Sequence, residues 1–364
     1  MRCCRGSILI LVMFVMTVLS LAALSFAYRV SLQSRAARQR AVMRQLQAQA
    51  ASAVAIAAAR LAENTNEFDH WAEPWHTHAP LAREDWLSEW GDELEDGSPI
   101  FSTDYQVVDE EGKLNVLSAS AEALQTLGMT DEQTDSLFDW MDADDIARGC
   151  GAETQDYQRV GLAYRSKNAP LETLEELLLI RGFTTVDFLG EDADHDRLLD
   201  PWENDGGRMV ATNWGDSPVP GFAMGGGSYP PDNGDGKLQL GWLDLLTCFG
   251  DGRINLNTAP QEVLETLPLS SGAVGQILGF RAFDEDSSGE LVDHVFKSAA
   301  DIDQLQGLTD VDRDVLRAIG AFRSQHFRIF VQSRHVPSGL TYWLQVVVRT
   351  GQQNPEIIQW KPGL

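Results

Sequence analysis

The chain opens on an unbroken apolar segment, residues 7–27, with the sequence SILILVMFVMTVLSLAALSFA. A helix of this length spans about 31 Å, which matches the hydrocarbon core of a bilayer. Residues 28–62 contain neither Gly nor Pro and are rich in Ala, Arg, Gln and Leu, a composition that favours continuation of the helix. The pattern predicts a membrane-spanning helix that continues into a long stem.

A cleaved secretory signal is the alternative for the same segment. Ser25 and Ala27 are small residues at positions −3 and −1 before Tyr28, although the apolar run exceeds the usual core of about 7–15 residues. Arginines cluster after the span, and the positive-inside rule alone would place the rest of the chain in the cytoplasm. The local pattern leaves both questions open.

The remainder alternates between strand-like and helical patterns. Residues 105–117 predict a strand, a turn and a strand, and residues 120–182 and 259–324 are helical. Residues 184–250 are rich in Gly, Pro, Asp and Asn and predict long loops. Three short segments near the end alternate as strands do: residues 327–333, 342–350 and 357–360. We therefore expect an α+β body interrupted by an all-α insertion.

The insertion contains an internal repeat. Residues 112–119 (GKLNVLSA) align with 252–259 (GRINLNTA), and the match resumes between 173–184 and 298–309. Each copy predicts an extended entry, a helix N-capped by Ser118 or Thr258, and a helical hairpin of the SAM-like or helix-hairpin-helix-like kind.

Charge argues against nucleic acid as a partner. Residues 254–281 resemble a helix-hairpin-helix module of DNA-binding proteins, but no Lys or Arg lies between Arg253 and Arg281. The net charge is −26, and residues 1–62 contain eight arginines and no acid, so residues 63–364 carry −34. So acidic a body repels phosphate backbones.

Several short motifs together resemble the K-type minor pseudopilin of bacterial type II secretion. The motifs are DEEGKLN (109–115), DWMDADD (139–145), GAE (151–153), YRSKNAP (164–170), LEEL (174–177) and INLNTA (254–259). Their order is collinear with the family over about residues 1–325. The resemblance implies a type IV pilin-like fold, with a long N-terminal helix plus an antiparallel sheet interrupted by the large α-domain.

The resemblance also implies how the chain is processed and placed. A prepilin peptidase would cut between Gly6 and Ser7, so that Leu11 occupies mature position five, where K-type members typically lack the usual glutamate. The body would then lie in the periplasm on a single inner-membrane anchor. Its partners would be the I- and J-type minor pseudopilins and the major pseudopilin, in a non-enzymatic tip complex that starts pseudopilus assembly.

The expected organisation follows from the motifs and the patterns together. Residues 1–6 are the leader, 7–27 the transmembrane segment, 28–62 the stem, 63–117 the first part of the pilin-like body, 118–325 the inserted α-domain and 326–364 the C-terminal strands. Within the insertion, two related modules at about 113–184 and 253–324 flank an acidic loop region, 185–252.

The acidic loop contains a candidate calcium site. Acids occupy positions one, three, five, nine and twelve of an EF-hand-like loop, and position seven would offer a backbone carbonyl; these residues are Asp192, Asp194, Asp196, Asp200, Glu203 and Leu198. Calcium takes six to eight hard oxygen ligands. Arg197 stands where the pattern has Gly. The plain alternative is an acidic surface loop, and residues 232–236 (DNGDG) form a weaker candidate.

Two further features have modest implications. Cys150 and Cys248 could form one disulfide outside the cytoplasm or remain two free thiols. The acids of residues 139–145 are interpreted as helix-end and loop charges, because no nucleophile, phosphate-binding loop or histidine stands near them in sequence. Neither feature predicts an enzyme.

Overall fold

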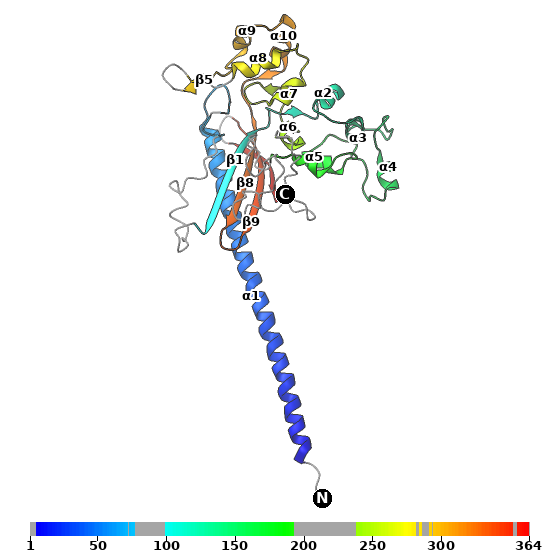
Figure 1. Ribbon diagram of the computed structural model, residues 1–364, viewed down its shortest axis with the longest axis vertical. Helices are drawn as coiled ribbons and strands as arrows, with labels where there is room; N and C mark the ends of the chain where they lie inside the picture. The colour runs from blue at the N-terminus through cyan, green and yellow to red at the C-terminus, as the bar shows by residue number, and fades with distance from the viewer. Residues whose placement is uncertain are drawn as a thin grey trace.

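A computed structural model describes residues 5–71, 73–76, 99–192, 238–281, 284–285, 291–292, 294–351 and 355–363. Its longest element is α1 (Arg5–Glu63), one continuous helix that leaves the rest of the molecule at one end (Figure 1). Among the described residues, it is the one helix whose length and composition would allow it to cross a membrane. The predicted span and stem are therefore a single helix.

The last third of α1 packs against the body. Its buried side chains recur at helical spacing and are mostly small: Leu46, Ala50, Ala53, Val54, Ala57 and Leu61. Small side chains let the helix axis approach the sheet closely, and the recurring positions form one buried stripe. Before Leu46 nearly every described side chain of α1 is exposed.

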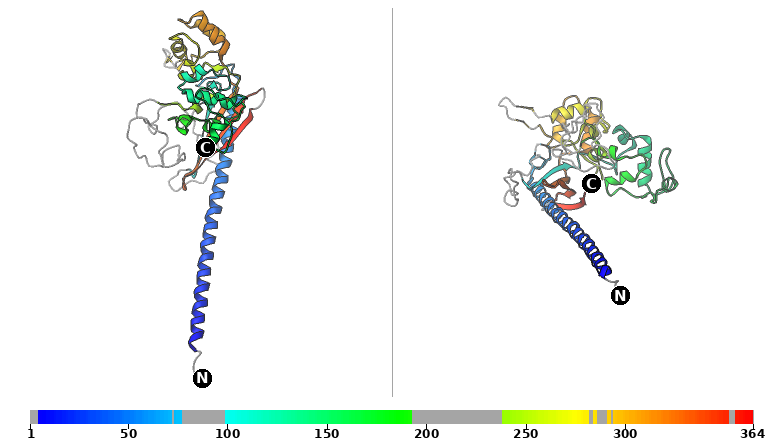
Figure 2. Two further views of the ribbon diagram at one scale, coloured as in Figure 1. Left: turned by 90° about the vertical axis from the view of Figure 1, so that its right-hand side faces the viewer. Right: turned by 60° about the horizontal axis from the view of Figure 1, so that its bottom comes forward.

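A four-stranded antiparallel sheet lies against this stripe. Its order is β1-β8-β9-β10, from strands β1 (Phe101–Asp109), β8 (His326–His335), β9 (Leu340–Arg349) and β10 (Glu356–Pro362). Phe327, Ile329 and Val331 belong to the cluster that packs on α1, whereas Phe330 belongs to the core of the insertion. The three predicted C-terminal strands are confirmed, and the alternation along β8 places the sheet between α1 and the insertion (Figure 2).

The insertion enters after β1 and returns to β8. Its helices are short: α2 (Ala121–Thr126), α3 (Asp131–Met141), α4 (Thr154–Arg159), the 3-10 helix η1 (Leu174–Leu179), α5 (Thr185–Leu189), α6 (Trp242–Leu245), α7 (Gln261–Glu265), α8 (Ala273–Phe280), α9 (Ala299–Gln304) and α10 (Asp310–Ile319). It also contains two-residue strands: β2 (Leu114–Asn115), β3 (Leu246–Thr247), β4 (Ile254–Asn255), β5 (Asp284–Glu285), β6 (Leu291–Val292) and β7 (Gly320–Ala321). The expectation of an all-α insertion is wrong in this respect, because the buried entry segments pair their backbone groups in small ladders.

The two repeat copies share this ladder. The entry strand β2 pairs in parallel with β3, and the entry strand β4 pairs in parallel with β7. The second copy therefore closes on itself, whereas the first pairs its entry strand with a segment that lies beyond it, just before the second copy. In the second half of each copy, Thr184 and Thr309 accept the hydrogen bonds that cap α5 and α10.

The predicted caps of the first helices are wrong by two residues. Ser120 caps α2, and Pro260 stands at the N-cap of α7. Thr258 instead donates its hydroxyl to Asp109 Oδ2 at 2.5 Å. Thr258 lies two residues before the N-cap position of α7, and its hydroxyl serves a tertiary contact with β1 instead.

Candidate functional site

Three acids come together where the chain leaves α3 and enters α4. Asp142, Asp144 and Glu153 each offer a carboxylate oxygen, and these oxygens lie within 4.8 Å of one another. Asp142 follows α3, and Glu153 precedes α4 as its N-cap residue. The turn through Gly149–Gly151 folds the two ends back onto each other.

The cluster contains buried oxygen atoms whose hydrogen bonding is incomplete. Glu153 is 3% exposed, and Asp142 Oδ1 is buried without a hydrogen-bond partner among the described residues. Burial raises the pKa of Glu153, more than the nearby Ser166 hydroxyl lowers it. Such a carboxylate is costly to ionise without a compensating charge.

Asn168 borders the same cluster with its amide. Its Nδ2 donates to Asp144 O at 2.9 Å and to Asp145 Oδ1 at 3.2 Å, whereas its Oδ1 is buried without a partner among the described residues. Its backbone has φ of +50°, in the left-handed region. Carboxylate oxygens that converge in this way are hard ligands of the kind that Ca²⁺ prefers. The residues present therefore fit a hard divalent cation.

Gly151 allows the cluster to close. A Cβ at this position would lie 1.9 Å from Asp139 Oδ2 and 3.1 Å from the carbonyl oxygen of Asp135. Asp139 is fully buried, and its carboxylate accepts hydrogen bonds from the backbone N–H of Arg148. The turn is thus held by an aspartate that the cluster itself does not use.

The calcium loop expected from the sequence lies mostly outside the described residues. Only Asp192 of that set is described, and it is buried; residues 193–237, which include the DNGDG stretch, are outside. The two described ends of this segment meet, since Gly190 and Leu240 form an antiparallel bridge. The structure therefore places the loop ends together and leaves the ligand set a prediction.

The sequence interpretation missed the Asp142–Glu153 cluster. It treated the acids of DWMDADD as helix-end charges, yet the alternating Asp142-Ala143-Asp144 pattern shortly before the GAE motif was a usable signal. The structure has Cys150 and Cys248 as free thiols, one exposed and one partly buried, and so does not contain the disulfide considered from the sequence. Gly6 and Ser7 lie at the start of α1, and Leu11 is 61% exposed.

A buried ion cluster joins the sheet to the insertion. Glu110, at the end of β1, accepts from Lys113 Nζ at 2.7 Å, from Arg328 Nε at 2.9 Å and from Thr247 Oγ1 at 2.7 Å. Glu110, Lys113 and Arg328 are each at most 1% exposed. Burial raises the pKa of Glu110, but the two cations outweigh it and hold that pKa well below its usual range.

A second buried node surrounds Asp109. Its carboxylate accepts from Asn255, Thr258 and Ser324, and Asp69 accepts from the backbone N–H of Ser324 at 2.7 Å. Burial raises the pKa of Asp69 to about 7 and that of Asp109 to about 6. The segment after α1, the end of β1 and the second repeat copy thus meet at shared hydrogen bonds.

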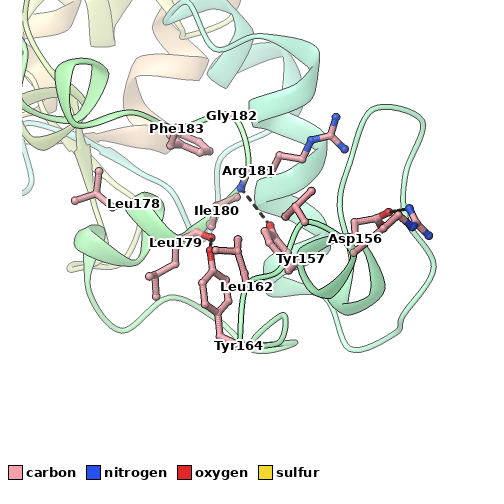
Figure 3. Close-up of a pocket in the computed structure, with 12 residues that line it drawn as sticks. Asp156, Tyr157, Leu162, Tyr164, Leu178, Leu179, Ile180, Arg181, Gly182 and Phe183 are labelled. Atoms are coloured by element: carbon pink, nitrogen blue, oxygen red, sulfur yellow. Dashed lines mark hydrogen bonds and ion pairs between the residues drawn. The ribbon is translucent and has the colours of Figure 1, made fainter.

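A pocket of about 500 Å³ lies on the insertion (Figure 3). Tyr157 Oη accepts from the backbone N–H of Arg181 at 3.2 Å, and Tyr164 Oη donates to Leu179 O at 2.8 Å. Its lining combines apolar side chains with the charged Asp156, Arg159 and Arg181. It contains no paired nucleophile and base among its described lining residues.

Comparisons with known proteins agree with this architecture. Residues 107–189 match the family model described as "Type II secretion system (T2SS), protein K". The fold is similar to a chain in the crystal structure of the GspK-GspI-GspJ complex from the enterotoxigenic Escherichia coli Type 2 Secretion System. That likeness has a TM-score of 0.54 and 14% identity, and covers 90% of this chain and 99% of the other. A search of curated proteins finds no match.

The matched segment contains the cluster of Asp142, Asp144 and Glu153 and most of the motifs on which the resemblance rests. At 14% identity, the structural likeness speaks for the fold alone, over nearly the whole chain. The family resemblance inferred from the motifs is confirmed: the chain is similar to protein K of the type II secretion system across residues 107–189, and it has the fold of a chain from the GspK-GspI-GspJ complex.

Proposed function

We propose that this protein is a minor pseudopilin that helps to initiate and cap the pseudopilus of a type II secretion system. The observation that carries the proposal is the continuous helix α1, which runs from a membrane-length apolar segment into the buried stripe beneath a pilin-like sheet. The match of residues 107–189 to protein K supports it.

The insertion suits a subunit at the tip. It emerges between β1 and β8; α7–α10 lie beyond the end of the sheet that is away from the free part of α1, and α3–α5 lie to one side (Figure 1). A bulky domain there would obstruct another subunit from stacking above. Leu11, an apolar residue at mature position five, fits a subunit that has no neighbour above it to contact.

The partners follow from the same proposal. The solved neighbour is a GspK-GspI-GspJ complex, and we infer I- and J-type minor pseudopilins as partners of this chain as well. The major pseudopilin, the prepilin peptidase and the inner membrane complete the set, with the body in the periplasm. The role is structural rather than enzymatic.

Nothing supports a nucleic-acid-binding function. The hairpin before α8, residues 268–272, carries no basic side chain, and the body is strongly acidic. An acidic surface repels the phosphate groups of a nucleic acid electrostatically.

Mass spectrometry of the mature N-terminus tests the proposal directly. We expect a start at Ser7, because the peptidase would cut after Gly6. A start at Tyr28 would instead identify a signal-cleaved, exported soluble protein and refute the pseudopilin proposal. Affinity capture from detergent extracts should also recover I- and J-type subunits, and repeated failure there would count against the tip role.

We further propose calcium as a structural ion. Asp142, Asp144 and Glu153 would hold one ion, with Asn168 Oδ1 beside them, and the loop of residues 192–203 stays a second proposed site. The ion would neutralise the buried carboxylates and join α3 to α4. The support is the set of three converging carboxylates and the burial of Glu153.

Thermal unfolding with and without chelator separates the two calcium sites. A ligand present at 100 times its Kd stabilises the folded state by about 2.7 kcal/mol. We expect Glu153→Gln to remove the part of the calcium response that belongs to the Asp142 cluster, and Asp194→Asn with Asp196→Asn to remove the part that belongs to the loop. An unchanged response in both variants would refute both sites.

A further inference from the structure

The part of α1 between the apolar segment and the body is bare and cationic. This bare stem, residues 28–45, contains five arginines and no acid, and all five are exposed: Arg29, Arg35, Arg38, Arg40 and Arg44. None of them forms an ion pair with another residue that the structure describes. A solvent-facing segment of this charge is unusual in a chain of net charge −26.

The bare stem is as long as the part of α1 that packs against the body. Residues 28–45 and residues 46–63 are equal in number, about 27 Å of helix each. The second stretch is the one covered by the sheet, through Ala50, Val54 and Leu61. A neighbouring body of similar build would therefore cover the bare stem from end to end.

The membrane does not account for the outer arginines. Arg40 and Arg44 lie about 20 and 26 Å beyond Ala27 along the helix, whereas the headgroup layer adds only about 5–8 Å to the hydrocarbon core. Even a tilt of about 40° leaves them roughly 15 and 20 Å from the end of the apolar segment. Arg29 lies nearest to the headgroups, about 3 Å beyond Ala27, and Arg35 follows at about 12 Å.

Charge identifies the kind of neighbour. Every acid of this chain lies beyond residue 62, and residues 63–364 carry −34. Arginines that follow a membrane span oppose export of the next segment, so these five disfavour the orientation in which the body lies in the periplasm. An acidic surface at the height of the bare stem would offset that cost by pairing with the arginines.

We infer that the bare stem is a docking surface for the acidic flank of a neighbouring pilin-like body, and that Arg40 and Arg44 are its central contacts. This inference rests on the proposed function, because it requires an assembly in which stems and bodies lie side by side. It specifies that the bare stem is the part of α1 that contacts the neighbour, and that the contact is made by charge pairing.

The experiment uses the full-length protein in a neutral detergent, with the I- and J-type subunits of the same organism as the probe. The variant R40E/R44E reverses two charges on an exposed helix. R40K/R44K retains the charge, and R159E/R253E makes the same charge change on exposed arginines of the insertion. Binding is measured at about 50 and 300 mM salt, and thermal unfolding checks that every variant folds.

We expect R40E/R44E to weaken binding at least tenfold at low salt and R40K/R44K and R159E/R253E to stay within about twofold of the wild type. Salt should weaken the wild type far more than R40E/R44E. Equal binding by R40E/R44E would overturn the inference. A defect that appears only in bilayers containing anionic lipid, and not in neutral detergent, would also overturn it and identify lipid as the occupant. If the wild type fails to bind either subunit, the proposed function itself fails.

Discussion

The buried ion cluster at the junction of sheet and insertion offers the sharpest test of what holds this fold together. Glu110→Gln keeps the shape of the side chain and removes its charge. Arg328 and Lys113, at most 1% exposed, would then stay buried without their counter-ion. Lys113 would keep its hydrogen bond to Leu243 O at 2.8 Å and a weaker electrostatic interaction with Asp244.

The expected loss follows from this geometry. Removing one partner of a buried ion pair costs about 3–5 kcal/mol, because the remaining charge is left uncompensated. An unfolding entropy of about 2.1 cal/mol/K per residue, over a body of roughly 300 residues, converts that loss into a Tm decrease of about 5–8 °C. The Glu110 carboxylate is ionised well above its lowered pKa, so the decrease should be constant between pH 6 and 8.

The assay is thermal unfolding of the full chain, with Glu356→Gln as the matched control. Glu356 also pairs with an arginine, Arg349, but the two side chains are 63% and 50% exposed, so the control should change Tm by less than about 2 °C. The double variant E110Q/R328M should recover part of the loss, since the guanidinium is no longer left unpaired. If Glu110→Gln changes Tm no more than the control does, the junction does not depend on this cluster.

Three further variants test other parts of the structure. Glu153→Gln should abolish calcium stabilisation at the Asp142 cluster in a chelator titration followed by Tm, and an intact response would refute that cluster as a site. Burial raises the pKa of Asp69 to about 7 in the folded protein, so the stability that its protonated form contributes is complete near pH 4 and is lost as pH rises through 7. The free energy of unfolding should therefore be on the order of 2 kcal/mol higher at pH 5.5 than at pH 7.5. Asp69→Asn should flatten this pH dependence, and an unaltered dependence would contradict the raised pKa. Gly151→Ala should lower the free energy of unfolding in denaturant by more than about 2 kcal/mol, because its Cβ would lie 1.9 Å from Asp139 Oδ2. Gly275→Ala, which has open space around it, should leave that free energy unchanged or raise it. Similar values for the two variants would show that the turn can relax.

Local patterns predict the elements whose shape depends on near neighbours in sequence. The long helix is predictable because residues 7–62 contain no Gly or Pro and keep strong helix formers throughout. The C-terminal strands are predictable because their alternation is local and one face must be buried. The family resemblance is carried by short motifs, which are also local. The sequence by itself thus determined the long N-terminal helix with its apolar first half, the C-terminal strands and the relationship of residues 107–189 to protein K.

Tertiary structure decided what distant segments do together. β1 pairs with β8 across the whole insertion, and β2 and β4 acquire partners that no local pattern announces. The acids of the Asp142 cluster converge because the turn through Gly149–Gly151 reverses the chain, whereas spacing alone suggested separate surface charges. Which strands pair and which carboxylates lie close together depends on how distant segments of the backbone are brought together. The packing of the whole core sets that arrangement, and no short stretch of sequence does.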